Sequence, residues 1–264
     1  MPAQSTALPV DFAAATSLAM ELDFNGAQPQ HFGAPVARST PFRSGDFEGD
    51  VARGASCNCN SITLIPHCNG THTEGVGHLT VGFRPLHEFV PLAPIPALLL
   101  TVAVVSSERT TEDSIPPPQA GDLLITREAL LRHWPASLSI APRALLLRTD
   151  PAVISRAGNT NPPYLSRQAA AEIVERGIEH LLLDLPSADR STDEGRLTAH
   201  RIFFGLPAGV IDAALATRSQ CTITELAQFP ARVPDGPCAV QLQIPAFTGD
   251  AVPSRPLHLP LVSA

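Results

Sequence analysis

The distribution of hydrophobic and polar residues predicts short strands in the middle of the chain. Three apolar runs of six to eight residues are rich in leucine and, in the first run, in β-branched residues, as buried strands are. They lie at 98–105 (LLLTVAVV), 143–149 (RALLLRT) and 180–185 (HLLLDL). Runs this short and this apolar predict strands that are covered on both faces of a sheet.

The segment between the last two runs has a helical pattern instead. Ser166 is suited to cap the first turn, and Ala170, Ile173 and Val174 form an apolar stripe. Gly177 supplies the residue at which such a helix ends. The order strand, helix, strand predicts a crossover unit of an α/β protein.

The remainder of the chain extends this picture. A second helix is predicted at 126–134, with Thr126 as its cap. Proline and glycine punctuate a β-rich region before residue 90, and residues 221–230 and 238–247 alternate as strands do. Because no internal repeat or long linker occurs, we predict one α/β domain with a mixed sheet over residues 1–264.

Composition and charge exclude several classes of function. The 264 residues are 44% hydrophobic and 16% charged, which is typical of a globular protein. The net charge of −7 and the lack of a basic cluster argue against nucleic acid or an anionic membrane as partner. All 18 basic residues are arginine, which excludes Schiff-base and P-loop lysines, and no G-x-S-x-G elbow occurs.

Targeting and cysteine patterns favour a cytoplasmic protein. The N-terminus has no basic segment before an apolar run, and the apolar stretch 90–105 is too short to span a bilayer and contains prolines. Five cysteines, an odd number, do not indicate a disulfide framework in a chain of this size. We therefore expect reduced thiols in the cytoplasm.

The stretch 66–79, PHCNGTHTEGVGHL, concentrates candidate chemistry. Pro66 and the Asn-Gly pair disfavour a helix, so an extended conformation is predicted for 68–74. Side chains of an extended chain alternate between two faces. One face then carries Cys68, Gly70, His72 and Glu74, and the other carries His67, Thr71 and Thr73.

Thiolate, imidazole and carboxylate on one face are competent ligands for a divalent metal such as zinc. Gly70 leaves room for an ion, and His78 follows a glycine-flanked turn that places it beside the site. The spacing alone is equally compatible with a polar, histidine-rich loop.

The segment CNGTHTEGVGH resembles the H-x-G-T-H-x-D-x-x-x-H signature of the metal-dependent kynurenine formamidase and cyclase family of amide hydrolases. Further segments resemble the family in the same order along the chain. They are LLLDLPSADR at 181–190, AHRIFF at 199–204, ITELAQFP at 223–230 and DAVPSRPLHL at 250–259. The resemblance implies a swivelling β/β/α fold and a homodimer or larger homo-oligomer, in which residues 1–55 contribute to contacts between subunits.

The resemblance also implies roles for individual residues. His72 and Glu74 take the positions of a ligand histidine and the ligand aspartate, and His200 and Glu225 take those of distal ligands. His78 takes the position of the general acid/base. In that family a metal-activated water attacks a formamide or lactam carbonyl while a histidine transfers the proton. Zinc, with manganese as the alternative, and one or two ions are implied.

Three departures from the family pattern bear on the substrate. Cys68 stands where the family has its first ligand histidine, with His67 one residue out of register, so that His67 as ligand would require a local bulge. Glu74 is one methylene longer than aspartate, which would move the ion or the backbone by about an ångström. Residues 205–220 lengthen the separation of His200 and Glu225.

Other polar residues receive structural interpretations. Cys57 and Cys59 are too closely spaced for a structural zinc pair and are assigned to strand packing. Asp189 and Arg190 are assigned to the capping and anchoring of a turn. No role is assigned to the five remaining histidines, which are His31, His87, His133, His180 and His258.

The sequence therefore predicts a metal-dependent hydrolase that cleaves the carbon–nitrogen bond of an aryl formamide or cyclic amide, with a small molecule as substrate. Two alternatives remain open. Loss of the first histidine and the longer acidic ligand are consistent with a catalytically silent relative that binds a small molecule. A lyase or cyclase that uses the ion as a Lewis acid is the other.

Overall fold

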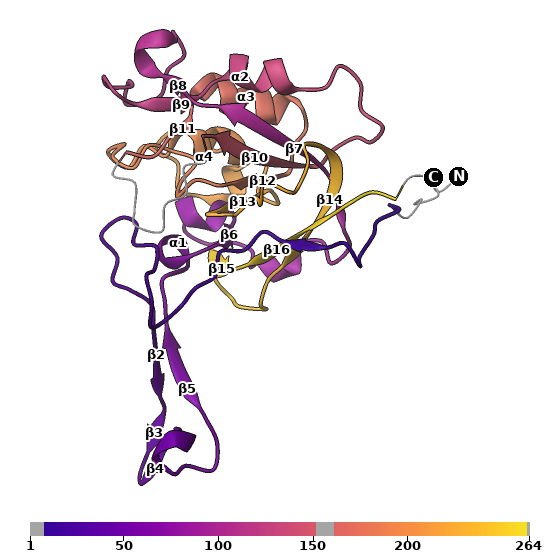
Figure 1. The fold of residues 1–264 in the computed structure, drawn as a ribbon. Helices are drawn as coiled ribbons and strands as arrows, with labels where there is room; N and C mark the ends of the chain where they lie inside the picture. The colour runs from indigo at the N-terminus through magenta and orange to yellow at the C-terminus, as the bar shows by residue number, and fades with distance from the viewer. Residues whose placement is uncertain (1–7, 152–160, 263–264) are drawn as a thin grey trace.

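A curled, nine-stranded mixed sheet organises the protein (Figure 1). The computed structural model describes residues 8–151 and 161–262. From one edge of this sheet to the other the strands are β1 (Thr16–Ser17), β16 (Arg255–Leu259), β14 (Gly236–Gln243), β7 (Ile95–Ala103), β10 (Ala144–Asp150), β12 (His180–Leu183), β13 (Thr222–Glu225), β6 (His72–Glu74) and β15 (Ala251–Pro253).

Four parallel strands form the centre of this sheet, and antiparallel strands extend it on both sides. Strands β7, β10, β12 and β13 run parallel to one another, whereas β14 and β6 join them antiparallel. The predicted strand–helix–strand unit is confirmed as β10, α3 (Arg167–Glu175) and β12. The predicted strands after residue 220 are confirmed as β13 and β14.

One predicted strand is divided in two. The run 98–105 belongs to β7 only as far as Ala103, and the chain then enters a second sheet of order β11–β9–β8. The strands of that sheet are β8 (Val105–Ser106), β9 (Leu123–Ile125) and β11 (Tyr164–Leu165). The apolar run did not reveal this break because Val105 remains partly buried against β9.

The central strands are apolar because both of their faces are covered. On β7, Leu98, Leu100 and Val102 face one core cluster, while Ala97 and Leu99 face another. The first cluster includes residues of three helices, α2 (Arg127–His133), α3 and α4 (Thr198–Phe204). Burial of both faces removes the alternation of polar and apolar residues, as expected for parallel strands.

The predicted helix caps are present. The Thr126 hydroxyl accepts the Ala129 N–H at 3.1 Å, and the Ser166 hydroxyl accepts the Ala169 N–H at 2.9 Å. Gly177 follows α3 with φ of +74°, a left-handed conformation that favours glycine. Five short 3₁₀ helices complete the described helices: η1 (Val51–Arg53), η2 (Val76–Leu79), η3 (Leu86–Glu88), η4 (Ser107–Arg109) and η5 (Ala213–Leu215).

The prediction of an extended chain from residue 68 onward is wrong for its first residues. Pro66–Asn69 form a single helical turn, α1, with Pro66 at a first-turn position, where the missing N–H costs no hydrogen bond. The Asn69 side chain closes this turn by accepting the Ile65 N–H at 2.7 Å. The extended strand β6 begins only at His72.

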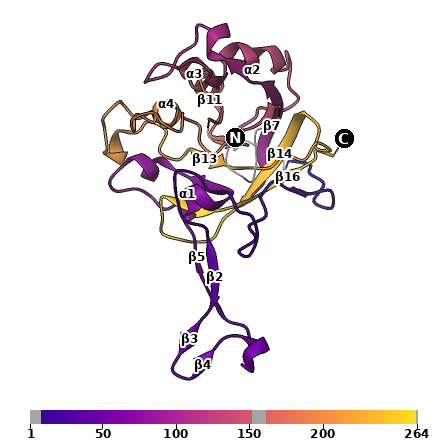
Figure 2. The same cartoon turned by 60° about the vertical axis from the view of Figure 1, so that its left-hand side comes forward.

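A hairpin arm, residues 38–63, projects from the body of the protein (Figures 1 and 2). Strand β2 (Arg38–Pro41) pairs with β5 (Asn60–Thr63) along its stem. Strands β3 (Arg43–Ser44) and β4 (Phe47–Glu48) pair near its tip. Three of its large apolar side chains, Phe42, Val51 and Ile62, are exposed.

Among the described residues, no helix has the length and apolar character needed to cross a membrane. The five cysteines are free thiols, of which Cys57 and Cys59 are exposed on the arm.

Candidate metal centre

Two neighbouring strands supply the base of the site. Strand β6 pairs antiparallel with β13, which places His72 opposite Glu225. His72 and Glu74 share one face of β6, and Thr73 points to the other face, where its hydroxyl lies 2.8 Å from that of Thr224. The alternation predicted for this part of the motif is therefore confirmed.

Helix α4 brings His200 to the same place, and Asp189 fixes it there. The Asp189 carboxylate accepts the backbone N–H groups of Ala199 and His200 at 2.7 and 3.1 Å. The same carboxylate lies 2.6 Å from His200 Nδ1. Asp189 thus caps the helix, as the sequence predicted for a turn, and in addition orients the imidazole.

Three imidazoles share one pattern of contacts. His72 Nδ1 lies 3.0 Å from the Gly70 carbonyl, and His67 Nε2 lies 3.0 Å from an Asp250 carboxylate oxygen. Carbonyl and carboxylate oxygens only accept hydrogen bonds, so these nitrogens and Nδ1 of His200 carry the protons. The other nitrogen of each ring faces the Glu74 carboxylate, with which it shares a proton where the two atoms lie within hydrogen-bond distance; a bound cation would take the place of that proton.

These nitrogens lie at different distances from the Glu74 carboxylate. His200 Nε2 lies 2.7 Å from Glu74 Oε1, and His67 Nδ1 lies 2.9 Å from Glu74 Oε2. His72 Nε2 lies 3.8 Å from Glu74 Oε2 and 3.5 Å from Glu225 Oε2. Glu74 is fully buried and is the common neighbour of all three rings.

Protons satisfy only part of this cluster. His200 Nε2 and His67 Nδ1 reach the Glu74 oxygens at 2.7 and 2.9 Å, where each pair needs a positive charge between nitrogen and oxygen. His72 Nε2 is buried and lies no nearer than 3.5 Å to a carboxylate oxygen. An unsatisfied buried polar atom costs on the order of 1–3 kcal/mol, so this nitrogen favours a bound ligand. A divalent cation is such a ligand, because it accepts lone pairs from imidazole and carboxylate together.

The ligand atoms group into two overlapping triads. His67, Glu74 and His78 form one, and His72, Glu74 and Glu225 form the other, with ligand atoms within 4.8 Å of one another in each triad. Since Glu74 belongs to both triads, the donor set would suit either one ion or two.

The charges of the site shift its pKa values away from ordinary ranges. Burial raises the pKa of Glu74, but the neighbouring imidazoles, chiefly through the charges of His78 and His200, together have a larger effect in the opposite direction, and the pKa falls well below the usual value. Burial lowers the pKa of His200, whereas Glu74 and Asp189 raise it well above the usual value. For His67, the bonds to Asp250 and Glu74 outweigh burial and raise the pKa to about 10. Carboxylates are thus stabilised in the charged form that metals bind.

The structure separates the two candidates for the first ligand position. His67 lies in the cluster, and Cys68 belongs to neither triad among the described residues. In the single turn of α1, successive side chains point in different directions. This turn takes the place of the local bulge that is expected to be necessary for His67 to be a ligand. Burial raises the pKa of the Cys68 thiol, which keeps it protonated.

The remaining predicted residues also lie in the cluster. His78, on η2, is partly exposed, and its Nδ1 lies 3.9 Å from oxygens of both Glu74 and Asp250. Glu225 also accepts the Ala188 N–H at 2.7 Å. His72, Glu74, His78, His200 and Glu225 are therefore brought together from four elements, β6, η2, α4 and β13.

Sequence reasoning missed Asp250 and one histidine. Asp250 precedes β15, the neighbour of β6, and hydrogen bonding to His67 lowers its pKa. No local sequence pattern links residues 67 and 250. His31 received no role, yet it is buried near enough for Glu225 and His72 to influence its pKa, which burial lowers.

Comparisons with known proteins identify the family and the fold. The model of the cyclase family, described as "Putative cyclase", matches residues 14–190. No curated protein matches the chain. Among solved structures, a potential metal-dependent hydrolase with cyclase activity superposes with a TM-score of 0.61 at 17% identity, over 94% of this chain and 98% of the other.

Two further structures have the same fold. A predicted metal-dependent hydrolase from Bacillus stearothermophilus gives a TM-score of 0.59 at 16% identity, covering 93% of this chain and 97% of the other. Isatin hydrolase A from Labrenzia aggregata gives 0.55 at 14% identity, covering 94% of each chain. With a family match over more than half its length and this fold, the chain belongs to the cyclase family.

Proposed function

We propose that the protein is a metal-dependent hydrolase that cleaves the carbon–nitrogen bond of an aryl formamide or a cyclic amide. One observation carries the proposal. The imidazoles of His67, His72 and His200 each have one nitrogen held by an oxygen acceptor, and each directs the other nitrogen at Glu74. Metal-binding histidines are held in this way, because the outer hydrogen bond fixes the tautomer and the ring orientation.

We assign metal binding to His67, His72, Glu74, His200 and Glu225, with zinc as the ion and manganese as the alternative. Imidazole nitrogens together with carboxylates suit both ions. A bound ion of this kind polarises a carbonyl and makes water acidic enough to act as a nucleophile near neutral pH. Cys68 remains a candidate ligand only if α1 rearranges, since its thiol lies outside both triads.

His78 is our candidate for proton transfer. Its ring is partly exposed and lies beside the proposed ligands, with ring centroids 4.3 Å from His67 and 5.5 Å from His200. Nδ1 is 3.9 Å from Asp250 Oδ2, which holds the imidazole near the centre. From this position His78 accepts a proton from water and delivers it to the leaving nitrogen of the amide.

The substrate class is inferred from the relatives. Isatin hydrolases share the fold, and one of them is bound to the product analogue thioisatinate, at 14% identity and a TM-score of 0.57. Ring opening of a lactam and cleavage of an aryl formamide are both attacks of water on an amide carbonyl. We therefore propose aryl formamides and lactams as the substrates to test.

Metal analysis followed by a substrate screen tests this function. Protein purified without a chelator or affinity tag is expected to contain one or two equivalents of zinc or manganese. It should hydrolyse an aryl formamide or isatin, lose this activity after dialysis against a chelator, and regain it when the ion returns. The variant His72→Ala should lack both metal and activity. His133→Ala, an exposed histidine on α2, is the matched control and should retain both.

The alternatives predict different results. A chain that stays metal-free in the presence of added zinc, and binds small molecules without turnover, would be a silent binding relative. A chain that holds metal and transforms a hydroxylated carbonyl compound without consuming water would be a lyase or cyclase. Either result would contradict the hydrolase proposal.

We also propose that the protein forms a homo-oligomer through the hairpin arm. The arm exposes Phe42, Val51 and Ile62, whose side chains contribute no core of their own. Exposed apolar residues on a projecting element are typical of a contact between subunits. Replacing Phe42 and Ile62 by serine should reduce the mass measured by analytical ultracentrifugation to that of a single chain. A wild type that sediments as a monomer would refute this proposal.

A further inference from the structure

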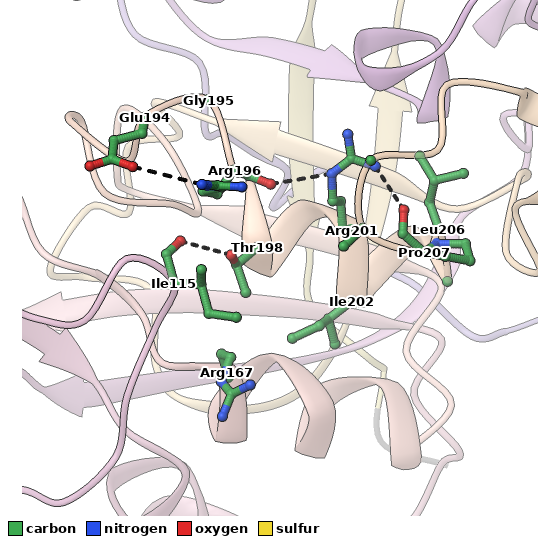
Figure 3. A pocket seen from close by; sticks show the side chains of 13 residues that line it. Ile115, Arg167, Glu194, Gly195, Arg196, Thr198, Arg201, Ile202, Leu206 and Pro207 are labelled. Atoms are coloured by element: carbon green, nitrogen blue, oxygen red, sulfur yellow. Dashed lines mark hydrogen bonds and ion pairs between the residues drawn. The ribbon is translucent and has the colours of Figure 1, made fainter.

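A cavity of about 710 Å³ lies beside helix α4, apart from the histidine centre (Figure 3). Its volume is within the range that drug-sized ligands occupy. Apolar side chains form much of its wall, among them Ile115, Ile202, Leu206 and Pro207. The segment 205–220, which lengthens the separation of His200 and Glu225 in this chain, contributes part of that wall through residues 205–209.

Helix α4 separates the cavity from the metal centre. Thr198, Arg201 and Ile202 line the cavity, as does Gly205 just after the helix. Residues spaced by three, four and seven lie on one side of a helix. His200 faces the opposite side, where its Nε2 approaches Glu74. A small molecule bound in the cavity would therefore contact helix α4, which positions His200, but would not reach the metal-binding atoms of the histidine centre.

The wall carries an excess of positive charge in a protein whose net charge is −7. Arg167, Arg196 and Arg201 line the cavity with one carboxylate, Glu194. Arg196 is loosely paired with that carboxylate at 3.9 Å, with both side chains largely exposed. Arg167 is paired with Asp113 at 2.8 Å. This leaves Arg201 as the cation to account for.

Arg201 is held by carbonyl oxygens rather than by a carboxylate. Its Nε donates to Arg196 O at 3.2 Å, and Nη1 donates to Pro207 O at 3.0 Å (Figure 3). Nη1 also donates to Val210 O at 2.9 Å. Across the described residues, no carboxylate oxygen lies within 4.0 Å of this guanidinium, and no hydrogen bond from its Nη2 occurs. Its position is thus fixed while its charge is unbalanced.

We propose that this cavity binds a small apolar carboxylate, with the carboxylate on Arg201 and Arg196 and the apolar part against Ile115, Ile202 and Leu206. Nη2 of Arg201 keeps N–H donors to which none of these carbonyl oxygens is bonded, so it can make a charge-assisted hydrogen bond to one carboxylate oxygen, and Arg196 lines the same cavity and can bind the other oxygen. The apolar wall selects a hydrocarbon or aromatic body over a bare inorganic anion. The site is independent of the proposed hydrolase activity, since it contains none of the metal-binding residues.

Ligand titrations on the full chain test the proposal. The fluorescent apolar anion 8-anilinonaphthalene-1-sulfonate is expected to bind with one site per chain and to be displaced by benzoate. The neutral analogue benzamide should displace it at least about ten-fold less well, the difference that one charge-assisted contact makes. Arg196→Gln and Arg201→Gln should each weaken benzoate binding about ten-fold. Ala208→Trp, at an exposed position on the wall, should block binding.

Two controls separate this site from others. Arg84→Gln removes an exposed arginine that does not line the cavity and should leave benzoate binding unchanged. Binding should also survive chelation of metal, whereas carboxylate binding at the metal centre would not. Circular dichroism establishes that each variant is folded, and Arg196→Gln tests the charge without removing the Arg201 contacts to the turn.

Three results would overturn the proposal. They are binding that disappears with the metal, equal binding of benzoate and benzamide, and unchanged binding in Arg196→Gln and Ala208→Trp together. A cavity covered by a second copy of the chain would also refute it. In that case the probe would bind only when dilution separates the chains, and Ala208→Trp would lower the mass in solution.

Discussion

The histidine centre and the hairpin arm differ in how far their charged side chains are exposed to solvent. On the arm, Glu48 pairs with Arg43 at 2.7 Å and with Arg53 at 2.9 Å, and the two arginines are mostly exposed. In the centre, Glu74 is fully buried, and its two oxygens lie 2.7 Å from His200 Nε2 and 2.9 Å from His67 Nδ1. Exposed ion pairs contribute little to the free energy of folding, whereas a buried carboxylate is costly to desolvate and must be compensated by nearby positive charge.

The difference shows which charged residues carry information about function. Water solvates the charged side chains of the arm, so the ion pairs there do not require a bound ligand. The centre buries Glu74 and Glu225 against His72 and His200, and a cation or protons must supply the positive charge that these carboxylates require. Convergence of buried imidazoles and carboxylates, rather than the number of histidines, therefore identifies the site.

The largest expected effect is at the carboxylate common to both triads. Glu74→Gln keeps the shape of the side chain but removes the charge and half of the oxygen ligands. We expect bound metal to fall to near zero and hydrolysis to fall below detection, as measured by elemental analysis and a substrate assay. Full metal content in this variant would show that the charge of Glu74 is not needed for metal binding, and that its burial, unlike the exposure of Glu48 on the arm, has another cause.

The next effect distinguishes His67 from Cys68. His67→Ala removes a nitrogen that lies 2.9 Å from Glu74, so zinc affinity should fall by at least about 100-fold, more than loss of an outer contact usually costs. Cys68→Ala removes a thiol outside both triads and should change zinc affinity less than threefold. Competition with a fluorescent zinc chelator measures both constants. The reverse order of effects would restore Cys68 as the ligand.

A smaller effect is expected at Asp184, a buried carboxylate outside the centre. Burial raises its pKa to about 6, despite hydrogen bonds from the backbone N–H and hydroxyl of Thr149. Its folded pKa exceeds the unfolded value of 3.8, so its stabilising contribution is complete below pH 3.8 and is lost as pH rises through about 6.

Asp184→Asn removes this titration. The difference in unfolding free energy between wild type and variant should shift in favour of the variant by on the order of 2 kcal/mol from pH 3.8 to pH 8. Urea denaturation of chelated protein at several pH values measures the shift. Parallel pH profiles for the two proteins would rule out a buried, titrating Asp184.

The smallest effect is expected on the arm. Glu48→Gln breaks two ion pairs of largely exposed arginines and should change the free energy of unfolding by less than about 0.5 kcal/mol. Urea denaturation at 0.1 M and 1 M salt checks this value, because salt screens exposed pairs. A loss of several kcal/mol would mean that the arm is buried in the assembled protein.

The sequence by itself determined the elements that depend on local pattern. Leucine-rich runs specified the parallel strands, Thr126 and Ser166 specified helix starts, and the alternation of His72 and Glu74 specified their common face. These features follow from side-chain period and capping chemistry, which operate over a few residues. The resemblance supplied His200 and Glu225, which no local pattern joins to the motif.

Tertiary structure decided the contacts between distant residues. The turn at Pro66–Asn69 places His67, rather than Cys68, beside Glu74. This turn forms because the Ile65 N–H donates to the Asn69 side chain, a contact that the strand-like pattern of the motif did not reveal. Asp250 reaches His67 through strand pairing across more than 170 residues of chain. Such contacts depend on how the sheet brings its strands together, and no short segment of the sequence encodes that arrangement.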